Sequence, residues 1–161
     1  GNNNPYCQDN EISWFDWNLE PWQEDLLATT THLLTIRREH PALRQRTWSL
    51  GRKVQDDGSV DLAWFAADGT PMDGEWHDPR TRTLQMLVNG AWLGVRSVLV
   101  VLHGGIHDAT VNLPDVPGLT AYRLLWDSAW ERPQPGTTVA PPGPVALSAL
   151  SMQVYAADDP S

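Results

Sequence analysis

Hydrophobic and polar positions follow a helical period in the first third of the chain. Between Pro21 and Pro41, apolar side chains recur every three to four residues, which predicts an amphipathic α-helix. Pro21 suits the first turn of that helix, and Pro41 ends it because the residue before a proline disfavours the helical conformation. The predicted face consists of Trp22, Leu26, Leu27, Thr30, Leu33, Leu34 and Arg37.

After about residue 47 the pattern changes to short β-like runs separated by turn signals such as Asp68-Gly69 and Asn89-Gly90. Residues 98–102 are apolar throughout, so we expect them at the centre of the fold. Several short strands joined by hairpin turns predict a mainly β protein with an antiparallel β-sandwich. The predicted strands are residues 47–53, 60–66, 83–88, 98–102, 109–113, 121–126 and 145–156, the last in one or two pieces.

Two segments read as loops. The first eighteen residues are rich in Asn, Asp and Trp without a sustained period, which predicts a structured loop before the helix. Residues 132–144 hold five of the thirteen prolines, which exclude central strand pairing and predict a surface loop.

Composition narrows the class of protein. A chain of 161 residues can bury one ordinary core, and a formal charge of −9 gives no electrostatic reason to bind nucleic acid or an anionic membrane. The single cysteine fits a reducing compartment, so we expect a cytoplasmic protein. The longest apolar run is too short to span a bilayer, and no signal peptide is visible.

Three segments carry a family resemblance. The first reads GNNNPYCQDNEISWFDW over residues 1–17, the second covers residues 33–44 with its His-Pro-Ala-Leu-Arg ending, and the third covers residues 63–79. Together they resemble the C-terminal part of a bacterial glycogen debranching enzyme of the isoamylase type, in the α-amylase superfamily. Family members usually carry Ala where Pro5 stands, and beyond Leu84 the resemblance is one of pattern.

This resemblance implies a parent enzyme with a (β/α)8 barrel and an all-β C-terminal domain that hydrolyses α-1,6 branch linkages in glycogen or limit dextrin. Residues 1–45 would be the last loop and helix of the barrel, and residues 46–161 the β-sandwich. The family's two Asp and one Glu of the retaining mechanism lie on earlier barrel strands, so no residue here is expected to be catalytic. We expect the chain alone to be inactive, the missing barrel and an α-glucan to be its partners, and no cofactor or metal.

The opening loop holds the candidate substrate-binding residues. Amides, hydroxyls and carboxylates suit sugar hydroxyls, an aromatic ring can stack on a sugar, and strand-to-helix loops line the active face of a barrel. Alternatively, these side chains pin the loop to its own backbone through Asx-type hydrogen bonds. The candidates are Asn3, Asn4, Tyr6, Gln8, Asp9, Asn10 and Trp14.

Other interpretations remain open or are disfavoured. A self-sufficient retaining pair among Asp9, Glu11 and Asp16 is disfavoured in so small a chain. The histidines at 77, 103 and 107 lack the spacing of a structural zinc site. An alternative function is a non-catalytic α-glucan-binding module that uses exposed aromatics. Packing is nevertheless the favoured role of the tryptophans, namely Trp14, Trp17 and Trp22 against the barrel and Trp64, Trp76, Trp92, Trp126 and Trp130 in the sandwich.

Overall fold

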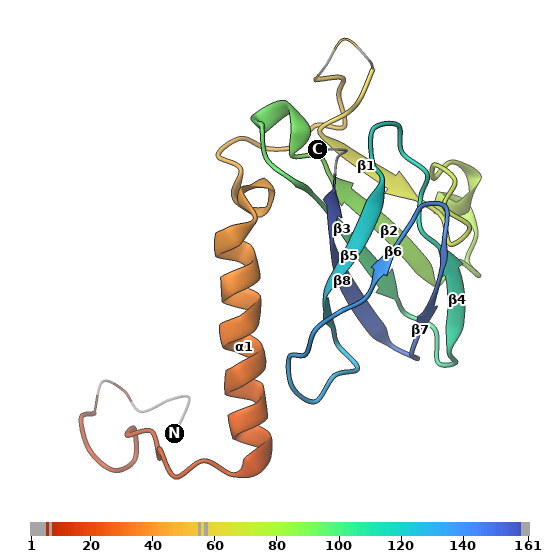
Figure 1. The fold of residues 1–161 in the computed structure, drawn as a ribbon. Helices are drawn as coiled ribbons and strands as arrows, with labels where there is room; N and C mark the ends of the chain where they lie inside the picture. The colour runs from red at the N-terminus through yellow and green to blue at the C-terminus, as the bar shows by residue number, and fades with distance from the viewer. Residues whose placement is uncertain (1–5, 7, 55, 57, 159–161) are drawn as a thin grey trace.

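The computed structural model describes residues 6, 8–54, 56 and 58–158, which form one long helix and two antiparallel sheets (Figure 1). The strand order in the larger sheet is β1-β2-β3-β8-β5-β6, and β4 pairs with β7 in the smaller one. The elements are α1 (Pro21–Glu39), η1 (Pro41–Arg44), β1 (Leu62–Phe65), η2 (Gly74–His77), β2 (Thr83–Val88), η3 (Ala91–Leu93), β3 (Ser97–His103), β4 (Ala109–Asn112), β5 (Ala121–Asp127), β6 (Thr138–Val139), β7 (Pro144–Leu147) and β8 (Ser151–Asp158).

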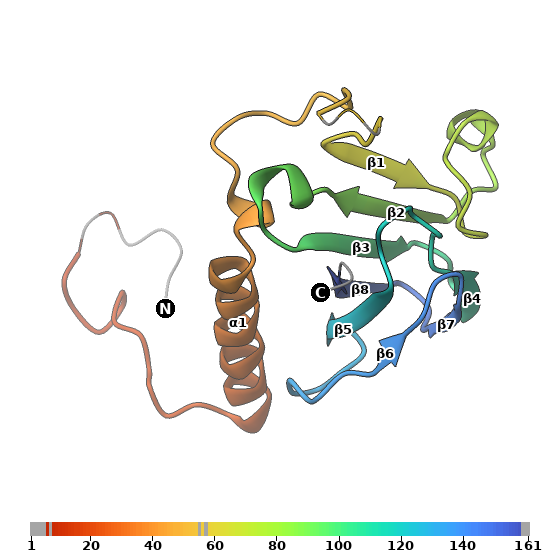
Figure 2. The ribbon, with the colours of Figure 1, turned by 45° about the horizontal axis from the view of Figure 1, so that its top comes forward.

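The larger sheet lies between two other layers. In Figure 2, α1 lies on one side of it and the β4–β7 pair on the other. The main core fills the space between the two sheets, where Leu99 and Tyr155 from the larger sheet pack against Leu113 and Leu147. This arrangement confirms the predicted mainly β fold with a sandwich.

Strand β3 lies at the centre, between β2 and β8. The side chains of Val98, Leu99 and Val101 are fully buried, as the unbroken apolar run predicted. The far end of the run differs, because Leu102 is exposed together with its half-buried partner on β2, Leu84.

Two buried glutamines flank Val101 in one row across the sheet. Gln85 of β2 and Gln153 of β8 are its register partners, and both side chains are almost completely buried. The Gln85 amide donates to the backbone oxygen of Asn112 at the end of β4 (2.8 Å), and the Gln153 amide donates to that of Ala146 in β7 (3.0 Å). Each glutamine therefore connects the larger sheet to the smaller one.

Helix α1 packs on the outer face of the larger sheet through a second core. Its buried residue Ile36 joins Val98, Trp126 and Val154 there. Further along the helix, His32 Nε2 lies 2.8 Å from the backbone oxygen of Leu125. The helix boundaries agree with the sequence prediction, since α1 begins at Pro21 and ends one residue before His40.

The predicted helix face differs from the face that contacts the sheet. Of the apolar stripe, Leu33 packs against the second core, whereas Trp22, Leu26 and Leu34 are more than half exposed. The contacting face combines apolar residues of the second core with polar side chains that have partners there. His32 lies against a backbone carbonyl of β5, and Asp25 of the first turns pairs with Arg132 from the loop between β5 and β6. Part of the apolar stripe therefore remains exposed.

Two strand predictions need correction. Residues 47–53 form no strand, because Asp61 accepts hydrogen bonds from the backbone N–H groups of Leu50 (2.8 Å) and Arg52 (3.2 Å) that a ladder would need. Gly51 between them takes a left-handed φ of 64°, which turns the chain. Within the loop predicted for residues 132–144, the two-residue strand β6 pairs with β5 at the edge of the sheet.

Candidate functional site

The segment of residues 8–18 forms a loop ahead of α1, away from the sheets (Figure 1). Asn10 organises its first turn. The backbone oxygen of Asn10 accepts from the N–H groups of Ser13 (2.9 Å) and Trp14 (3.0 Å), and its side-chain oxygen accepts from Ile12 N–H (3.1 Å). Asn10 therefore makes the Asx-type bonds that keep a turn in place.

Two carboxylates of the loop also make local hydrogen bonds. Asp9 Oδ1 accepts from the indole nitrogen of Trp14 at 2.7 Å, which fixes the direction of that ring. Asp16 Oδ1 accepts from both the backbone N–H (2.9 Å) and the side-chain amide (3.0 Å) of Asn18. These two acids thus support the loop backbone and its aromatic side chains.

The remaining predicted binding residues divide into two groups. Asn3 and Asn4 lie outside the described residues. Tyr6 is 80% exposed with a left-handed φ of 46°, and the backbone oxygen of Gln8 accepts a hydrogen bond from the Ser13 hydroxyl. Accessible polar and aromatic groups at Tyr6, Gln8 and Trp14 therefore lie on one short loop, while Asp9 and Asn10 hold its shape.

Beside this loop, an apolar groove of about 370 Å³ separates the loop from the first turns of α1. Phe15 and Trp17 meet edge to face in its wall, with ring centroids 4.9 Å apart. None of the described residues that line it is charged; they are Phe15, Trp17, Leu19, Trp22, Gln23, Leu26, Leu27 and Thr30. Such a lining suits the apolar surface of another protein segment better than a polar sugar.

The inner face of α1 was missed by the sequence reasoning. Asp25, His32 and Ile36 contact the sheet or its loops, at positions seven and four residues apart. That spacing is visible in the sequence, but the predicted helix face contains none of these three residues. Arg132, from the proline-rich loop, pairs with Asp25 and Glu24, and the hydrogen bond to Asp25 raises the pKa of Arg132.

The described part of the chain offers neither a metal site nor a membrane span. No group of three His, Cys, Asp or Glu side chains lies close enough to hold a metal ion among these residues. Likewise, no helix in this part of the chain is both long enough and apolar enough to cross a bilayer.

Comparison with known proteins places the chain among enzymes of glycogen metabolism. A glycogen debranching enzyme of Cronobacter sakazakii is 41% identical over 116 residues, which are 71% of this chain and 15% of that protein. The glycogen operon protein GlgX homolog of Mycobacterium tuberculosis is 38% identical over 92 residues, or 56% of this chain and 13% of that protein. No family model matches the chain.

The fold also has a relative among solved structures. A pullulanase from Anoxybacillus sp. LM18-11, crystallised with maltotetraose, aligns over 91% of this chain and 17% of its own, with a TM-score of 0.53 and 14% identity. At this identity the likeness concerns the fold alone. The chain spans about 15% of the length of the curated relatives it matches.

Proposed function

Because this chain belongs to the family of bacterial glycogen debranching enzymes, we propose that it forms the C-terminal part of an enzyme that hydrolyses α-1,6 branch linkages in glycogen and limit dextrin. Residues 1–45 complete the catalytic barrel, and residues 46–161 form the β-sandwich domain. The catalytic carboxylates belong to the part of the enzyme that the matched segment does not cover. We assign the enzyme to the cytoplasm, in line with its single cysteine.

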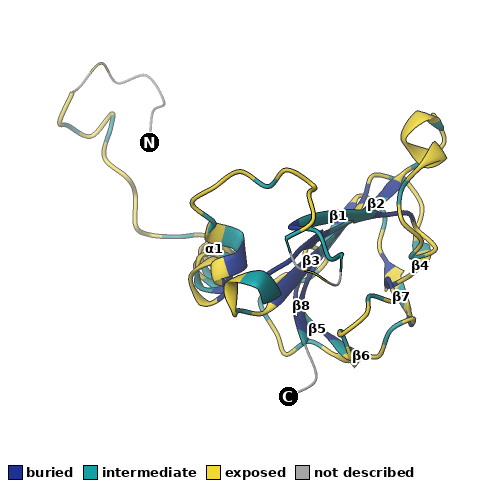
Figure 3. Cartoon of the chain, turned by 90° about the horizontal axis from the view of Figure 1, so that it is seen from above, coloured by how far each residue is buried: buried dark blue, intermediate teal, exposed yellow. Residues whose placement is uncertain are grey.

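The two faces of α1 carry this proposal. The inner face packs on the larger sheet, while Trp22, Leu26 and Leu34 on the other face are exposed next to the apolar groove. In Figure 3, much of α1 and most of the loop ahead of it have the colour of exposed residues. A contiguous apolar surface of this kind marks an interface with another protein segment. The catalytic barrel is the partner that fits, since the sequence resemblance implies that α1 is the last helix of that barrel.

The loop of residues 8–18 borders the substrate cleft in this arrangement. Gln8 and Trp14 of the loop, together with Tyr6 just before it, provide the side chains that contact the α-glucan, and Asn3 and Asn4 are proposed as further substrate-binding residues. Asp9 and Asn10 act mainly by holding the loop, as their hydrogen bonds to Trp14 and Ile12 support. The chain therefore shapes and stabilises the cleft and supplies no catalytic acid.

A chimeric enzyme tests the proposal. The matching segment of the Cronobacter sakazakii enzyme is replaced by this chain, and reducing ends released from glycogen and limit dextrin are measured. We expect the chimera to hydrolyse branch linkages and the purified 161-residue chain to release nothing. Hydrolysis by the chain alone would overturn the assignment of the acids, and a folded but inactive chimera would overturn the assignment of the segment.

The cleft-bordering role is tested in the same chimera by Trp14→Ala. The expected result is a several-fold higher KM for limit dextrin, because the ring loses its contact with the sugar. Trp48→Ala is the matched control, since Trp48 is 92% exposed and lies outside the loop. Equal kinetics for the two variants would remove the loop from the substrate site.

A further inference from the structure

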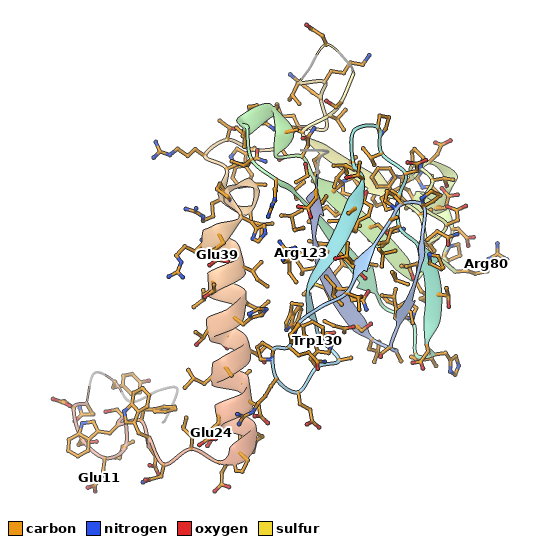
Figure 4. The ribbon with its side chains drawn as sticks, viewed as in Figure 1. Glu11, Glu24, Glu39, Arg80, Arg123 and Trp130 are labelled. Atoms are coloured by element: carbon orange, nitrogen blue, oxygen red, sulfur yellow. The ribbon has the colours of Figure 1, made fainter. Side chains whose placement is uncertain are left out.

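A second groove lies at the opposite side of the chain from the loop of residues 8–18. Figure 4 shows the two regions through their labelled residues, Glu11 in the loop and Arg80 after η2. The groove encloses about 400 Å³ between the η2 segment and the ends of β2 and β3. This volume falls within the range of about 300–1,000 Å³ that is typical of small-molecule sites.

One tryptophan forms an accessible wall of this groove. Trp76 is 49% exposed, so a large part of its indole can be reached from solvent. The ring is held from behind by Trp64 of β1, edge to face, with centroids 5.6 Å apart and an interplanar angle of 75°. Met72, the half-buried Leu84 and the exposed Leu102 add apolar side chains to the lining of the groove. A ring already fixed in place loses little conformational entropy when a ligand stacks on it.

Charged side chains of both signs border the same groove. Glu75, Asp78 and Arg82 all line it, together with the hydroxyl-bearing Thr81. The Arg80 side chain donates two hydrogen bonds to Asp78, at 3.1 and 3.0 Å, and these bonds lower the pKa of Asp78. Asp78 is therefore ionised and fixed at neutral pH, where it can accept hydrogen bonds from hydroxyl groups.

The segment that carries these groups is preformed. The Thr81 hydroxyl donates to the backbone oxygen of Glu75 (3.0 Å), and Glu75 Oε2 accepts from Asp73 N–H (3.0 Å). Arg82 Nη1 donates to the backbone oxygens of Pro79 (2.5 Å) and Thr81 (2.9 Å), which restrain the guanidinium. Donors, acceptors and ring thus keep their positions without a ligand.

This combination points to a neutral sugar. Because two carboxylates and a guanidinium border the groove, it favours neither an anionic nor a cationic ligand clearly. The hydroxyl groups of a sugar can both donate to the carboxylates and accept from the guanidinium. The apolar C–H face of a pyranose matches the exposed indole. The groove beside α1 makes the contrast clear, because none of its described lining residues is charged, as expected for contact with protein.

We propose that the groove between η2 and the β2–β3 ends binds a linear α-1,4-glucan chain, with one glucose stacked on Trp76 and its hydroxyls bonded to Asp78 and Arg82. The choice of an α-glucan among neutral saccharides rests on the proposed function. The sandwich is then a glucan-binding module as well as a support, and the role of Trp76 changes from edge packing to a sugar platform.

The test follows the indole N–H signals of the 161-residue chain by ¹H–¹⁵N NMR during titration with maltoheptaose, with cellopentaose as the comparison sugar. We expect saturable shifts of the Trp76 signal, assigned with Trp76→Phe, and little response to cellopentaose. Trp76→Ala should weaken maltoheptaose binding about tenfold or more, while Trp48→Ala leaves it unchanged. The other indole signals report whether each variant is folded, and Arg82→Gln provides a second, milder variant.

Several outcomes would overturn the proposal. Shifts confined to Trp14 and Trp17 would place the sugar on the loop instead, and equal response to cellopentaose would reject an α-glucan site. If Trp76→Ala weakens maltoheptaose binding in the chain and not in the chimera, the groove is a contact surface for the barrel. If the chimera is inactive but the Trp76 signal shifts with maltoheptaose, the proposed function is overturned and the sugar site in the groove stands. If the chimera is active but the Trp76 signal does not shift, the sugar site is overturned and the proposed function stands.

Discussion

Replacing Gln153 by leucine tests how the two sheets are held together. The Gln153 amide nitrogen donates to Asp127 Oδ2 (2.6 Å) as well as to the backbone of β7, and its oxygen accepts from the Tyr155 hydroxyl (2.6 Å). All three side chains are at least nine-tenths buried. The leucine preserves much of the volume and removes every one of these bonds.

The expected loss follows from the groups that remain. A hydrogen bond to a charged group contributes about 1.5–3 kcal/mol, and each buried polar group left without a partner costs about 1–3 kcal/mol. With the carboxylate of Asp127 and the hydroxyl of Tyr155 both affected, and some compensation from the apolar leucine, we expect a loss of about 3–5 kcal/mol. For a chain of this size that corresponds to a decrease in Tm of about 6–20 °C.

Gln85→Leu is the matched control, because it sits in the same row on the other side of Val101. Its side-chain oxygen is buried without a partner among the described residues, so leucine removes an unpaired polar atom there. Its amide nitrogen donates to the backbone oxygens of Asn112 and Ala66, and the latter also accepts from Gly69 N–H. Gln85→Leu should therefore cost less than Gln153→Leu, about 1–2 kcal/mol, because only the Asn112 oxygen loses its side-chain donor without a second donor in this set. Urea unfolding followed by tryptophan fluorescence measures both, and equal losses, or a loss below about 1 kcal/mol for Gln153→Leu, would refute this reasoning.

Three further predictions follow from other parts of the molecule. Burial raises the pKa of Tyr122 and Tyr155 above the ordinary value of about 10. The stability from their neutral forms is therefore complete below about pH 10 and is lost as the pH rises toward the raised pKa; thermal melts from pH 8 to 11.5 should show this fall, reduced in Tyr122→Phe. Asp61→Ala should cost about 1–3 kcal/mol and accelerate hydrogen exchange of the two loop amides it binds; unchanged exchange would exclude this role. Leu33→Gln should destabilise the chain by about 1–3 kcal/mol in urea unfolding, and Leu34→Gln by less than about 0.5, whereas equal effects would contradict the helix orientation.

Local rules were enough to predict the elements whose cause is local. Pro21 and Pro41 set the helix boundaries, and the β-like run before Asn89-Gly90 gave the bounds of β2. The strand prediction for residues 47–53 was wrong for a non-local reason. The carboxylate of Asp61, which lies outside that segment, accepts hydrogen bonds from two of its backbone N–H groups. The hydrophobic pattern of a segment gives no information about a side chain elsewhere in the chain, here Asp61, that binds the backbone of that segment.

The candidate site shows a related limit. Hydropathy predicted an apolar stripe on α1, but the sheet contacts the face that carries His32 and Ile36, and most of the stripe is exposed. The loop residues were named from resemblance, and the local bonds of Asp9 and Asn10 appeared only in three dimensions. The sequence favoured packing for Trp76, whereas its side chain is half exposed and lines a groove. This exposure depends on how η2 packs against β2 and β3, which the sequence pattern does not report.

The attachment of α1 is unequal at its two ends. Near its C-terminal end, Ile36 and the following turn are held by the apolar second core, whereas the N-terminal end is held by ion pairs of Arg132 with the exposed Glu24 and the partly buried Asp25. Exposed ion pairs contribute little and weaken with salt. The C-terminal end of the helix is therefore held more firmly than its N-terminal end. Small movements of the aromatic loop at the N-terminal end would therefore cost little free energy and would leave the apolar core at the other end of the helix undisturbed.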